Sequence, residues 1–250
     1  MIDLQNITFG YKGTDATGVL HHTSGVRELN LHVSAGEFVV IAGGSGCGKT
    51  TVTRLINGLV PHYYEGELEG NARVCGLDVR ETKISELSVH VGSVFQNPRS
   101  QFFNVDTTSE LAFASENRCV DPKQIRADIK RVVGEMNMEA LVDRSIFALS
   151  GGEKQKVACA SVAVAEPKVI VLDEPSSNLD AAGIEDLRRV LALWKEKGKT
   201  IVVAEHRLYY LADLADRLIV MGDGRIAEEL DASQIVSMTS DDAYERELRS

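Results

Sequence analysis

A glycine-rich stretch that ends in lysine and threonine carries the clearest chemistry in the 250-residue sequence. It fits the pattern G-x-x-x-x-G-K-[ST], with Gly43, Gly44, Ser45, Gly46, Cys47, Gly48, Lys49 and Thr50. Glycines let the backbone adopt positive φ and pass close to a ligand, so that successive N–H groups can converge on an anion. The stretch therefore predicts a phosphate-binding loop, in preference to a plain turn between a strand and a helix.

The residues that close this loop extend the predicted site to a nucleotide and its metal. Lys49 is expected to reach the β- and γ-phosphates, and the hydroxyl of Thr50 is expected to bind Mg²⁺. The helix that begins here directs free N–H groups and the positive end of its dipole at the same anion, so Thr51 is also assigned to the nucleotide. Together these residues predict nucleotide binding with Mg²⁺.

Two adjacent carboxylates, Asp173 and Glu174, follow the strongly apolar stretch 168–172. That stretch is rich in β-branched residues and is expected to be a buried central strand. Asp173 is predicted to hold Mg²⁺ through water, and Glu174 to orient and deprotonate an attacking water. A solvated acidic turn is the alternative, and the apolar residues before it disfavour it.

A second predicted anion site begins at Ser150. Ser150 and Glu153 have the spacing of a capping box, which by itself indicates only the start of a helix. Gly151 and Gly152 lower the helix propensity of the first turn, yet they leave its N–H groups accessible to an anion. A second anion-binding helix terminus in one chain requires a second phosphate or a second subunit.

Four single residues are further candidates because of their positions. Tyr11, near the end of the first expected strand, could stack on a nucleobase or pack as an edge tyrosine, and both interpretations stay open. Gln96 and His206 each follow an expected strand, at the edge where ligands bind in open α/β sheets, although such residues are more often structural. Asp180 is a plausible helix N-cap, which could be its whole role.

Alternating strands and helices are expected to position these side chains. Strands are predicted at 2–11, with a slip near Gln5 and Asn6, and at 29–33, 38–42, 89–95, 168–172, 199–204 and 217–221, with an exposed strand or hairpin within 61–76. Helices are predicted at 50–59, 83–87 and 108–117, from Pro122 onward, from Ser150 to about residue 165, and after Asp180. A loop is expected at 10–25, and a turn with a polar tail from 222 onward.

Composition limits the classes of protein that remain. The length allows one large α/β domain or two small ones, and the hydrophobic fraction of 44% is ordinary for a globular protein. No apolar run approaches the ~20 residues that span a bilayer, and the first residues do not resemble a secretory signal, so a membrane role is expected to come through a partner. The four cysteines form no C-x-x-C pair, which suggests neither a zinc site nor a disulfide framework. The net charge of -10 argues against nucleic acid as the main partner.

Taken together and in this order, GGSGCGKT, Gln96, LSGGEKQ, VIVLDE, Asp180 and His206 closely resemble the ATP-binding cassette ATPases. The resemblance covers nearly the whole chain, and the LSGG element distinguishes it from other phosphate-loop proteins. It implies the α/β fold of P-loop NTPases, with a RecA-like core, an antiparallel β subdomain and an inserted α-helical subdomain. On this chain it implies one ATP-binding domain over 1–250: core and β subdomain at 1–95 and 166–222, helical subdomain at 96–165 and a C-terminal segment at 223–250.

The resemblance also implies roles for single residues, with ATP and Mg²⁺ as cofactors. Two cassettes would pair head to tail, so that Ser150, Gly151 and Gly152 of one cover the γ-phosphate held by the other. Tyr11 would stack on adenine, and Gln96 would sense Mg²⁺ and the attacking water. His206 would contact the γ-phosphate as the switch histidine, and Asp180 would lie across the dimer interface.

Shorter segments within the family resemble the energy-coupling factor transporters, which import vitamins or transition-metal ions such as cobalt or nickel. These segments are 95–98 with Gln101, 57–59 and 204–208. The implied partners are a second ATPase subunit and integral membrane subunits, at the cytoplasmic face of the cell membrane. Glu153 and Asn178 stand where many cassettes have Gln and Ala, and the chain ends soon after its last expected strand, which also fits half of a tandem protein. The alternatives are a non-transport cassette on DNA or ribosomes, and a regulatory nucleotide-binding module.

Overall fold

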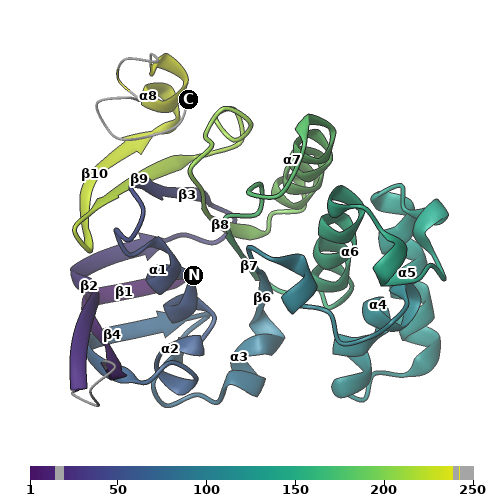
Figure 1. Ribbon diagram of the computed structural model, residues 1–250, viewed down its shortest axis with the longest axis horizontal. Coiled ribbons are helices and arrows are strands. Elements are labelled where there is room, and N and C mark those ends of the chain that lie inside the picture. Colours follow the sequence, from purple (N-terminus) through teal and green to yellow (C-terminus); the bar gives the residue numbers. More distant parts are fainter. Residues whose placement is uncertain (15–19, 239–241, 243–250) are drawn as a thin grey trace.

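The computed structural model describes residues 1–14, 20–238 and 242, and two β-sheets organise it (Figure 1). One sheet has six strands in the order β10-β9-β3-β8-β7-β6, and the other has four antiparallel strands in the order β2-β1-β4-β5. The strands are β1 (Ile2–Thr14), β2 (Leu20–Val33), β3 (Phe38–Gly43), β4 (Gly66–Val74), β5 (Leu77–Asp78), β6 (Val91–Val94), β7 (Val169–Asp173), β8 (Thr200–Ala204), β9 (Arg217–Gly222) and β10 (Arg225–Asp231).

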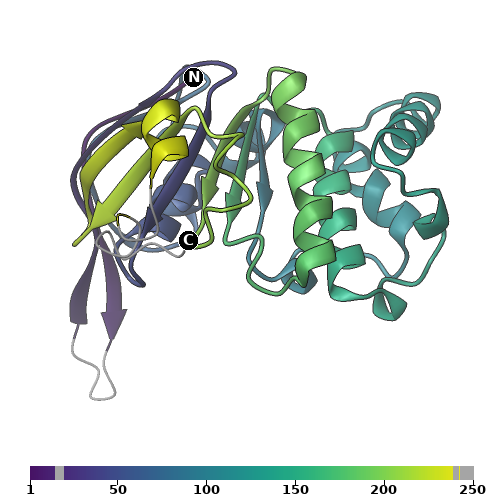
Figure 2. The ribbon, with the colours of Figure 1, turned by 90° about the horizontal axis from the view of Figure 1, so that it is seen from above.

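Helices cover the six-stranded sheet and extend from one side of it (Figure 2). They are α1 (Lys49–Ile56), α2 (Leu59–His62), α3 (Ile84–His90), α4 (Thr107–Asn117), α5 (Pro122–Glu135), α6 (Gly151–Val164), α7 (Ala181–Glu196) and α8 (Ala232–Ser237). Short 3₁₀ turns occur at Pro98–Ser100, Glu139–Leu141 and Ile146–Ala148. Within the described ranges, none of these helices has the length and apolarity needed to cross a membrane.

The central strands carry apolar side chains on both faces, as parallel strands covered on two sides do. In β3, Phe38 and Val40 face a core shared with α6 and α7, whereas Val39 and Ile41 face a core shared with α1 and the four-stranded sheet. The residues of β7 divide between the same two cores. Burial on both faces of β7 is therefore confirmed, although β7 lies next to the edge strand β6.

Parallel pairing brings the predicted site residues to one edge of this sheet. Strands β6, β7, β8 and β3 pair in parallel, so their carboxyl ends point the same way. The phosphate loop follows β3, Gln96 follows β6, Glu174 follows β7 and His206 follows β8. Residues from four distant parts of the chain thus gather at the edge where ligands bind in open α/β sheets.

The predominantly helical segment between β6 and β7 begins its main helices with side-chain caps. The carboxylate of Asp106 accepts a hydrogen bond from the backbone N–H of Ser109 at 2.9 Å, which starts α4. Asp121 accepts from the N–H of Lys123 at 2.7 Å and Pro122 occupies the first turn of α5, so that predicted helix start is confirmed. Helices α4 and α5 pack against α6, and α6 in turn contacts strand β6 of the six-stranded sheet.

Two boundaries expected from the sequence are wrong because local geometry overrides the apolar pattern. The helix expected at 50–59 ends at Ile56, and Gly58, with φ of 77°, turns the chain into the short helix α2. The strand expected at 89–95 covers only Val91–Val94, because residues 89 and 90 continue helix α3.

Two segments expected to lack regular structure contain strands. The expected loop at 10–25 is wrong for the described part, because β1 and β2 continue through it as a long antiparallel ladder; residues 15–19 lie outside the described residues. The expected polar tail is wrong for 225–237, since β10 pairs with β9 and is followed by α8. An antiparallel edge strand exposes alternate polar residues, so its composition resembles that of a tail. Residues 239–241 and 243–250 of that tail also lie outside the described residues.

Candidate functional site

The phosphate loop has a backbone conformation that favours glycine at three of its positions. Gly43, Gly46 and Gly48 have φ of 144°, 79° and 107°. A Cβ atom on Gly48 would lie 2.6 Å from the carbonyl oxygen of Gly25, which is far inside contact distance. A Cβ atom on Gly46 would meet no atom within 4 Å. Gly48 is therefore required by both conformation and space, and Gly46 by conformation alone.

Lys49 holds its ammonium group inside the curve of this loop. Its side chain is buried, and Nζ donates hydrogen bonds to the carbonyl oxygens of Gly43 at 2.9 Å and Gly44 at 3.0 Å. The loop carbonyls thus fix a full positive charge where the backbone N–H groups and the start of α1 already favour an anion. This cradle has the chemistry of a polyphosphate site.

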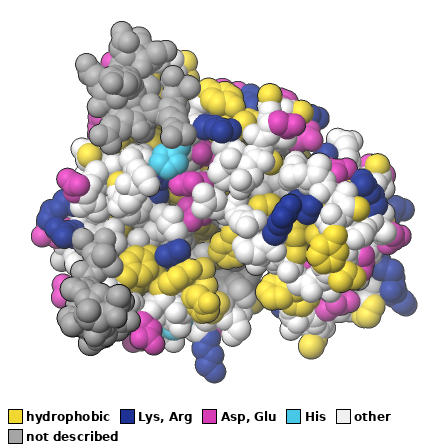
Figure 3. Space-filling view, in the orientation of Figure 1, with side chains coloured by type: hydrophobic (Ala, Val, Ile, Leu, Met, Phe, Trp, Pro, Cys, Tyr) yellow, Lys and Arg dark blue, Asp and Glu magenta, His cyan; other side chains and the backbone are white. Residues whose placement is uncertain are grey.

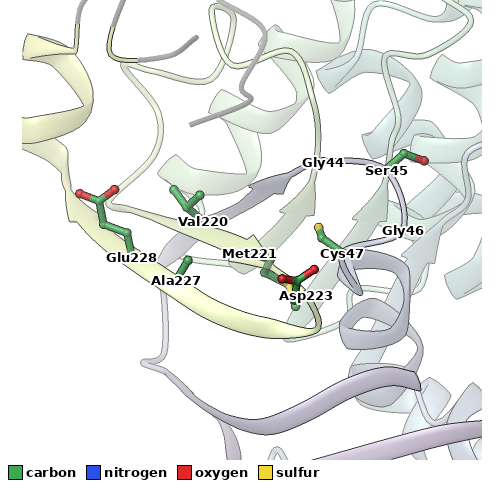
Figure 4. A pocket seen from close by; sticks show the side chains of 10 residues that line it. Gly44, Ser45, Gly46, Cys47, Val220, Met221, Asp223, Ala227 and Glu228 are labelled. Carbon is green, nitrogen blue, oxygen red and sulfur yellow. The ribbon is translucent and has the colours of Figure 1, made fainter. Parts of the chain in front are cut away.

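The turn between β9 and β10 supports the loop from the other side. The N–H of Gly224 donates to the carbonyl oxygen of Cys47 at 3.2 Å, and the N–H of Arg27 donates to the carbonyl oxygen of Gly224 at 2.8 Å. An open pocket of about 580 Å³ lies between the loop and this hairpin, with Asp223 beside Cys47 (Figure 4). Sequence reasoning treated this turn as a simple connection, and its contact with the loop appears only in the fold.

Thr50 and Asp173 form a set of oxygen atoms suited to Mg²⁺. The Thr50 hydroxyl donates to Oδ1 of Asp173 at 3.2 Å, and Gln96 lines the same pocket of about 340 Å³. Burial raises the pKa of Asp173 above its usual value, because the charged carboxylate there has lost solvation. Mg²⁺ prefers oxygen ligands, and a cation would restore the balance of charge around Asp173, so these residues fit the ion.

The carboxylate of Glu174 lies between the side chains of Gln96 and His206. Its Oε2 accepts a hydrogen bond from Nε2 of Gln96 at 2.8 Å, and its Oε1 lies 3.0 Å from Nε2 of His206. The backbone of Glu174 has φ of 45°, and its N–H donates to the carbonyl oxygen of Ala204 at 2.8 Å. Three loops at the sheet edge thus orient one carboxylate, which can accept a proton from water.

Tyr11 lies within β1 instead of at its end, and it contacts the nucleotide pocket. Its hydroxyl is 3.0 Å from Oγ1 of Thr51 and accepts a hydrogen bond from Nη1 of Arg54 at 3.1 Å. Tyr11, Thr51 and Arg54 line a pocket of about 360 Å³ with Ser45, Gly46, Gly48, Lys49, Thr50 and Glu174. Tyr11 therefore both packs against its neighbours and borders the space beside the phosphate loop.

Ser150, Gly151 and Gly152 begin helix α6 as the sequence predicted. The N–H of Glu153 donates to Oγ of Ser150 at 3.3 Å, and the N–H of Ser150 donates to Oε2 of Glu153 at 2.7 Å, so the capping box is confirmed. These hydrogen bonds from Ser150, and then Arg144, hold the pKa of Glu153 below its usual value. None of the three signature residues lines the pocket around this chain's own Lys49.

Asp180 has the structural role expected of it, because its Oδ1 accepts from the N–H of Gly183 at 2.8 Å and starts helix α7. The signature helix lies next to it: a Cβ atom on Gly152 would be 3.5 Å from Cα of Gly183. Asp180 and the start of α6 thus belong to one surface, separate from the pocket around Lys49.

Sequence reasoning missed two polar residues that the fold brings to this site. Arg54 lies one helical turn after Thr50, and its guanidinium stacks 3.9 Å from the ring centroid of Tyr64. Glu205 directly precedes His206 and is buried. The i, i+4 spacing from Thr50 could have indicated Arg54, and the position beside His206 could have indicated Glu205.

Comparisons with known proteins identify the family of this chain. A family model described as ABC transporter matches residues 26–177. A protein named putative ABC transporter ATP-binding protein, from Treponema denticola, is 47% identical over 249 residues and covers 100% of this chain. The chain spans about half the length of the Treponema denticola relatives that it matches.

Two solved structures are similar in fold. Clostridium perfringens cbiO1, described as part of the ABC transporter complex cbiONQ, has a TM-score of 0.79 at 25% identity, covering 98% of this chain and 93% of its own. The ATP-binding cassette MJ0796, in a dimeric post-hydrolysis state with ADP and Pi, has a TM-score of 0.79 at 24% identity, covering 93% and 99%. The predicted fold class, with its antiparallel sheet and helical insertion, is confirmed. The chain therefore belongs to the ABC transporter family.

Proposed function

We propose that this cassette powers a membrane importer of the energy-coupling factor type, with a vitamin or a transition-metal ion such as cobalt or nickel as cargo. The observation that carries the proposal is the likeness to cbiO1 over 98% of this chain. The segments 95–98, 57–59 and 204–208, which resemble that subfamily, lie at or beside the site edge, and Asn57 donates to Ser93 at 3.1 Å there. Both the overall fold and the local sequence thus support this subfamily.

In the proposed hydrolysis of ATP, with Mg²⁺ as cofactor, each residue of the site has a separate role. Lys49 and the loop N–H groups bind the phosphates, while Thr50, Gln96 and Asp173 hold Mg²⁺, which neutralises phosphate charge when bound. Glu174 accepts the proton of the attacking water. His206 and Gln96 hold its two carboxylate oxygens in place, as their distances of 3.0 and 2.8 Å indicate.

The second proposed partner is another cassette, in a homodimer or as the other half of a tandem or heterodimeric protein. Ser150, Gly151 and Gly152 present the exposed start of a helix away from this chain's own pocket, so they are available to cover a nucleotide held elsewhere. The similar MJ0796 structure is described as dimeric, which supports pairing of two cassettes. Asp180, beside this helix start, would lie at the interface between the two cassettes.

Integral membrane subunits are the third proposed partner, at the cytoplasmic face of the cell membrane. Phe103 and Phe147, on the segment between β6 and β7, are 75% and 78% exposed, and Phe103 stacks on Phe113 at 4.8 Å. Figure 3 shows hydrophobic side chains gathered on this part of the surface. Exposed clusters of large apolar side chains mark interaction surfaces, which supports docking of a membrane partner there.

The chain is proposed to consist of a core with a β subdomain, a helical subdomain and a C-terminal segment. Residues 1–95 and 166–222 form the core and the β subdomain, and 96–165 form the helical subdomain that carries the signature. The segment 223–250 follows, and its strand β10 extends the core sheet through pairing with β9. All of these parts belong to one ATP-binding domain over 1–250.

The paired state is tested with Glu174→Gln, which is expected to retain ATP without turnover. Gel filtration with ATP and Mg²⁺ is expected to show a dimer, and Gly152→Asp in the same background is expected to give a monomer that still binds ATP. The added carboxylate fits a helix start but repels a phosphate. Gly152→Asn is the neutral control of matched size. A monomer with Glu174→Gln, or a dimer unaffected by Gly152→Asp, contradicts the shared site.

The transport role is tested on detergent-solubilised native membranes. Tagged cassette is expected to copurify with integral membrane proteins, and the double variant Phe103→Ser, Phe147→Ser is expected to lose them while keeping its ATPase rate. Metal and vitamin analysis of the purified complex then identifies the cargo class. Copurification of ribosomes or DNA in place of membrane proteins would favour the non-transport alternative.

A further inference from the structure

Glu205 is a buried carboxylate at the carboxyl end of β8, directly before His206. It is 2% exposed, and four hydrogen-bond donors meet its two oxygens. Oε1 accepts from the N–H groups of His206 at 2.7 Å and Arg207 at 3.2 Å. Oε2 accepts from the N–H of Ser176 at 3.2 Å and from the hydroxyl of Tyr210 at 2.8 Å.

These four donors belong to two different loops of the site. His206 and Arg207 begin the loop after β8, whereas Ser176 belongs to the loop after β7, two residues beyond Glu174. The guanidinium of Arg207 reinforces the same junction by donating to the carbonyl oxygen of Ser176 at 3.4 Å. Glu205 therefore joins the loop of Glu174 to the loop of His206.

The loop after β7 needs such support because its backbone is strained. Glu174 has φ of 45°, a conformation that residues other than glycine adopt only when their surroundings hold them there. The N–H of Glu174 is held by Ala204, and the N–H of Ser176 is held by Glu205. Two consecutive residues at the end of β8 thus fix the backbone on both sides of the strained turn.

Burying a carboxylate is costly unless its oxygens are hydrogen-bonded, and an apolar side chain would fill the same space more cheaply. Here every hydrogen bond to the carboxylate comes from the junction of the two site loops or from Tyr210. Burial, and then the charge of Glu205, hold the pKa of Tyr210 well above its usual value, so its phenol remains a donor. The hydrogen bonds of the Glu205 carboxylate therefore hold the two site loops together.

We propose that Glu205 is a positioning residue for ATP hydrolysis, which sets the relative placement of Glu174 and His206 by bonding the backbones of both loops. The proposal rests on the proposed roles of Glu174 and His206. It predicts that a change at Glu205 impairs turnover while nucleotide binding stays intact, because Lys49 and the phosphate loop are attached to a different strand, β3.

The test is Glu205→Gln, which keeps the volume but leaves the N–H of Ser176 opposite an amide NH₂. The turnover number is expected to fall by roughly 10- to 100-fold, while the dissociation constant for ATP changes by less than about twofold. Glu196→Gln, an exposed carboxylate at the end of α7, is the matched control and is expected to behave as wild type. A turnover number within about twofold of wild type overturns the proposal, as does an equal loss of turnover and ATP affinity.

Tyr210→Phe tests the proposed role of Glu205 if Glu205→Gln does not fold. It removes one donor from Oε2 and keeps the three backbone donors. A turnover number lower by about threefold with unchanged ATP affinity supports the proposal, and an unchanged turnover number overturns it. Glu174→Gln distinguishes failure of the proposed function from failure of the role of Glu205. If Glu174→Gln still hydrolyses ATP, the proposed role of Glu174 is wrong. If Glu174→Gln is inactive and Glu205→Gln is fully active, only the role of Glu205 is wrong.

Discussion

Nε2 of His206 lies 3.0 Å from Oε1 of Glu174, although 31 residues separate them in the chain. The contact exists because β7 and β8 are parallel neighbours, with Asp173 paired to Ala204, so the loops after both strands leave the sheet together. His206 therefore has Glu174 as its side-chain partner. The loop after β8 therefore contacts the carboxylate that is proposed to accept the proton of water.

Glu174→Gln is expected to lower the rate of ATP hydrolysis by at least about 100-fold while ATP binding persists. An amide can still bond Gln96 and His206, but it cannot accept a proton from water. Phosphate release and equilibrium binding of a fluorescent ATP analogue measure the two properties. Glu185→Gln, on the exposed face of α7, is the control. Undiminished phosphate release by Glu174→Gln removes Glu174 from the proposed role.

Lys49→Ala is expected to raise the dissociation constant for ATP by at least about tenfold, because hydrogen bonds to charged groups contribute roughly 1.5–3 kcal/mol each. The variant also leaves the carbonyl groups of Gly43 and Gly44 without the Nζ that now bonds them. Isothermal titration with ATP and Mg²⁺ measures the affinity. Lys130→Ala on the exposed face of α5 serves as control, and tight ATP binding by Lys49→Ala argues against the loop assignment.

Gly48→Ala is expected to destabilise the protein more than Gly46→Ala does. Both positions have positive φ, so an alanine at either costs about 1–2 kcal/mol in backbone strain. Only at Gly48 does the new Cβ also collide with the carbonyl oxygen of Gly25. Urea unfolding of the two variants gives the comparison directly. Equal losses of unfolding free energy would show that the collision relaxes at no cost.

Glu153→Gln is expected to lower the free energy of unfolding near neutral pH, with a deficit that disappears in acid. The pKa of Glu153 is lowered in the folded protein, so its contribution is present above the unfolded-state pKa of about 4.3 and is lost as the pH falls through the folded-state pKa. Glutamine preserves the capping pattern but does not titrate. Urea unfolding of both proteins at several pH values tests this, and a deficit independent of pH contradicts the assignment.

The sequence by itself predicted the strands and loops that carry the chemistry, because those signals are local. Glycines with a following lysine specify the phosphate loop, Ser150 and Glu153 specify a helix start, and the apolar residues before Asp173 specify a buried strand. It was wrong at 10–14, 20–25 and 225–237, where antiparallel pairing between neighbouring strands, β1 with β2 and β9 with β10, or packing beside them, overrides a polar composition.

The tertiary structure alone decided which side chains meet. No spacing in the chain indicates that Glu174 contacts both Gln96 and His206, since that follows from the order of the strands β6, β7 and β8 in the sheet. The same holds for Glu205, whose four donors come from two loops that only parallel pairing brings together. The residue type determines which chemistry a side chain can perform. The order of the strands determines which groups that side chain contacts, because hydrogen bonds act only within a few ångströms.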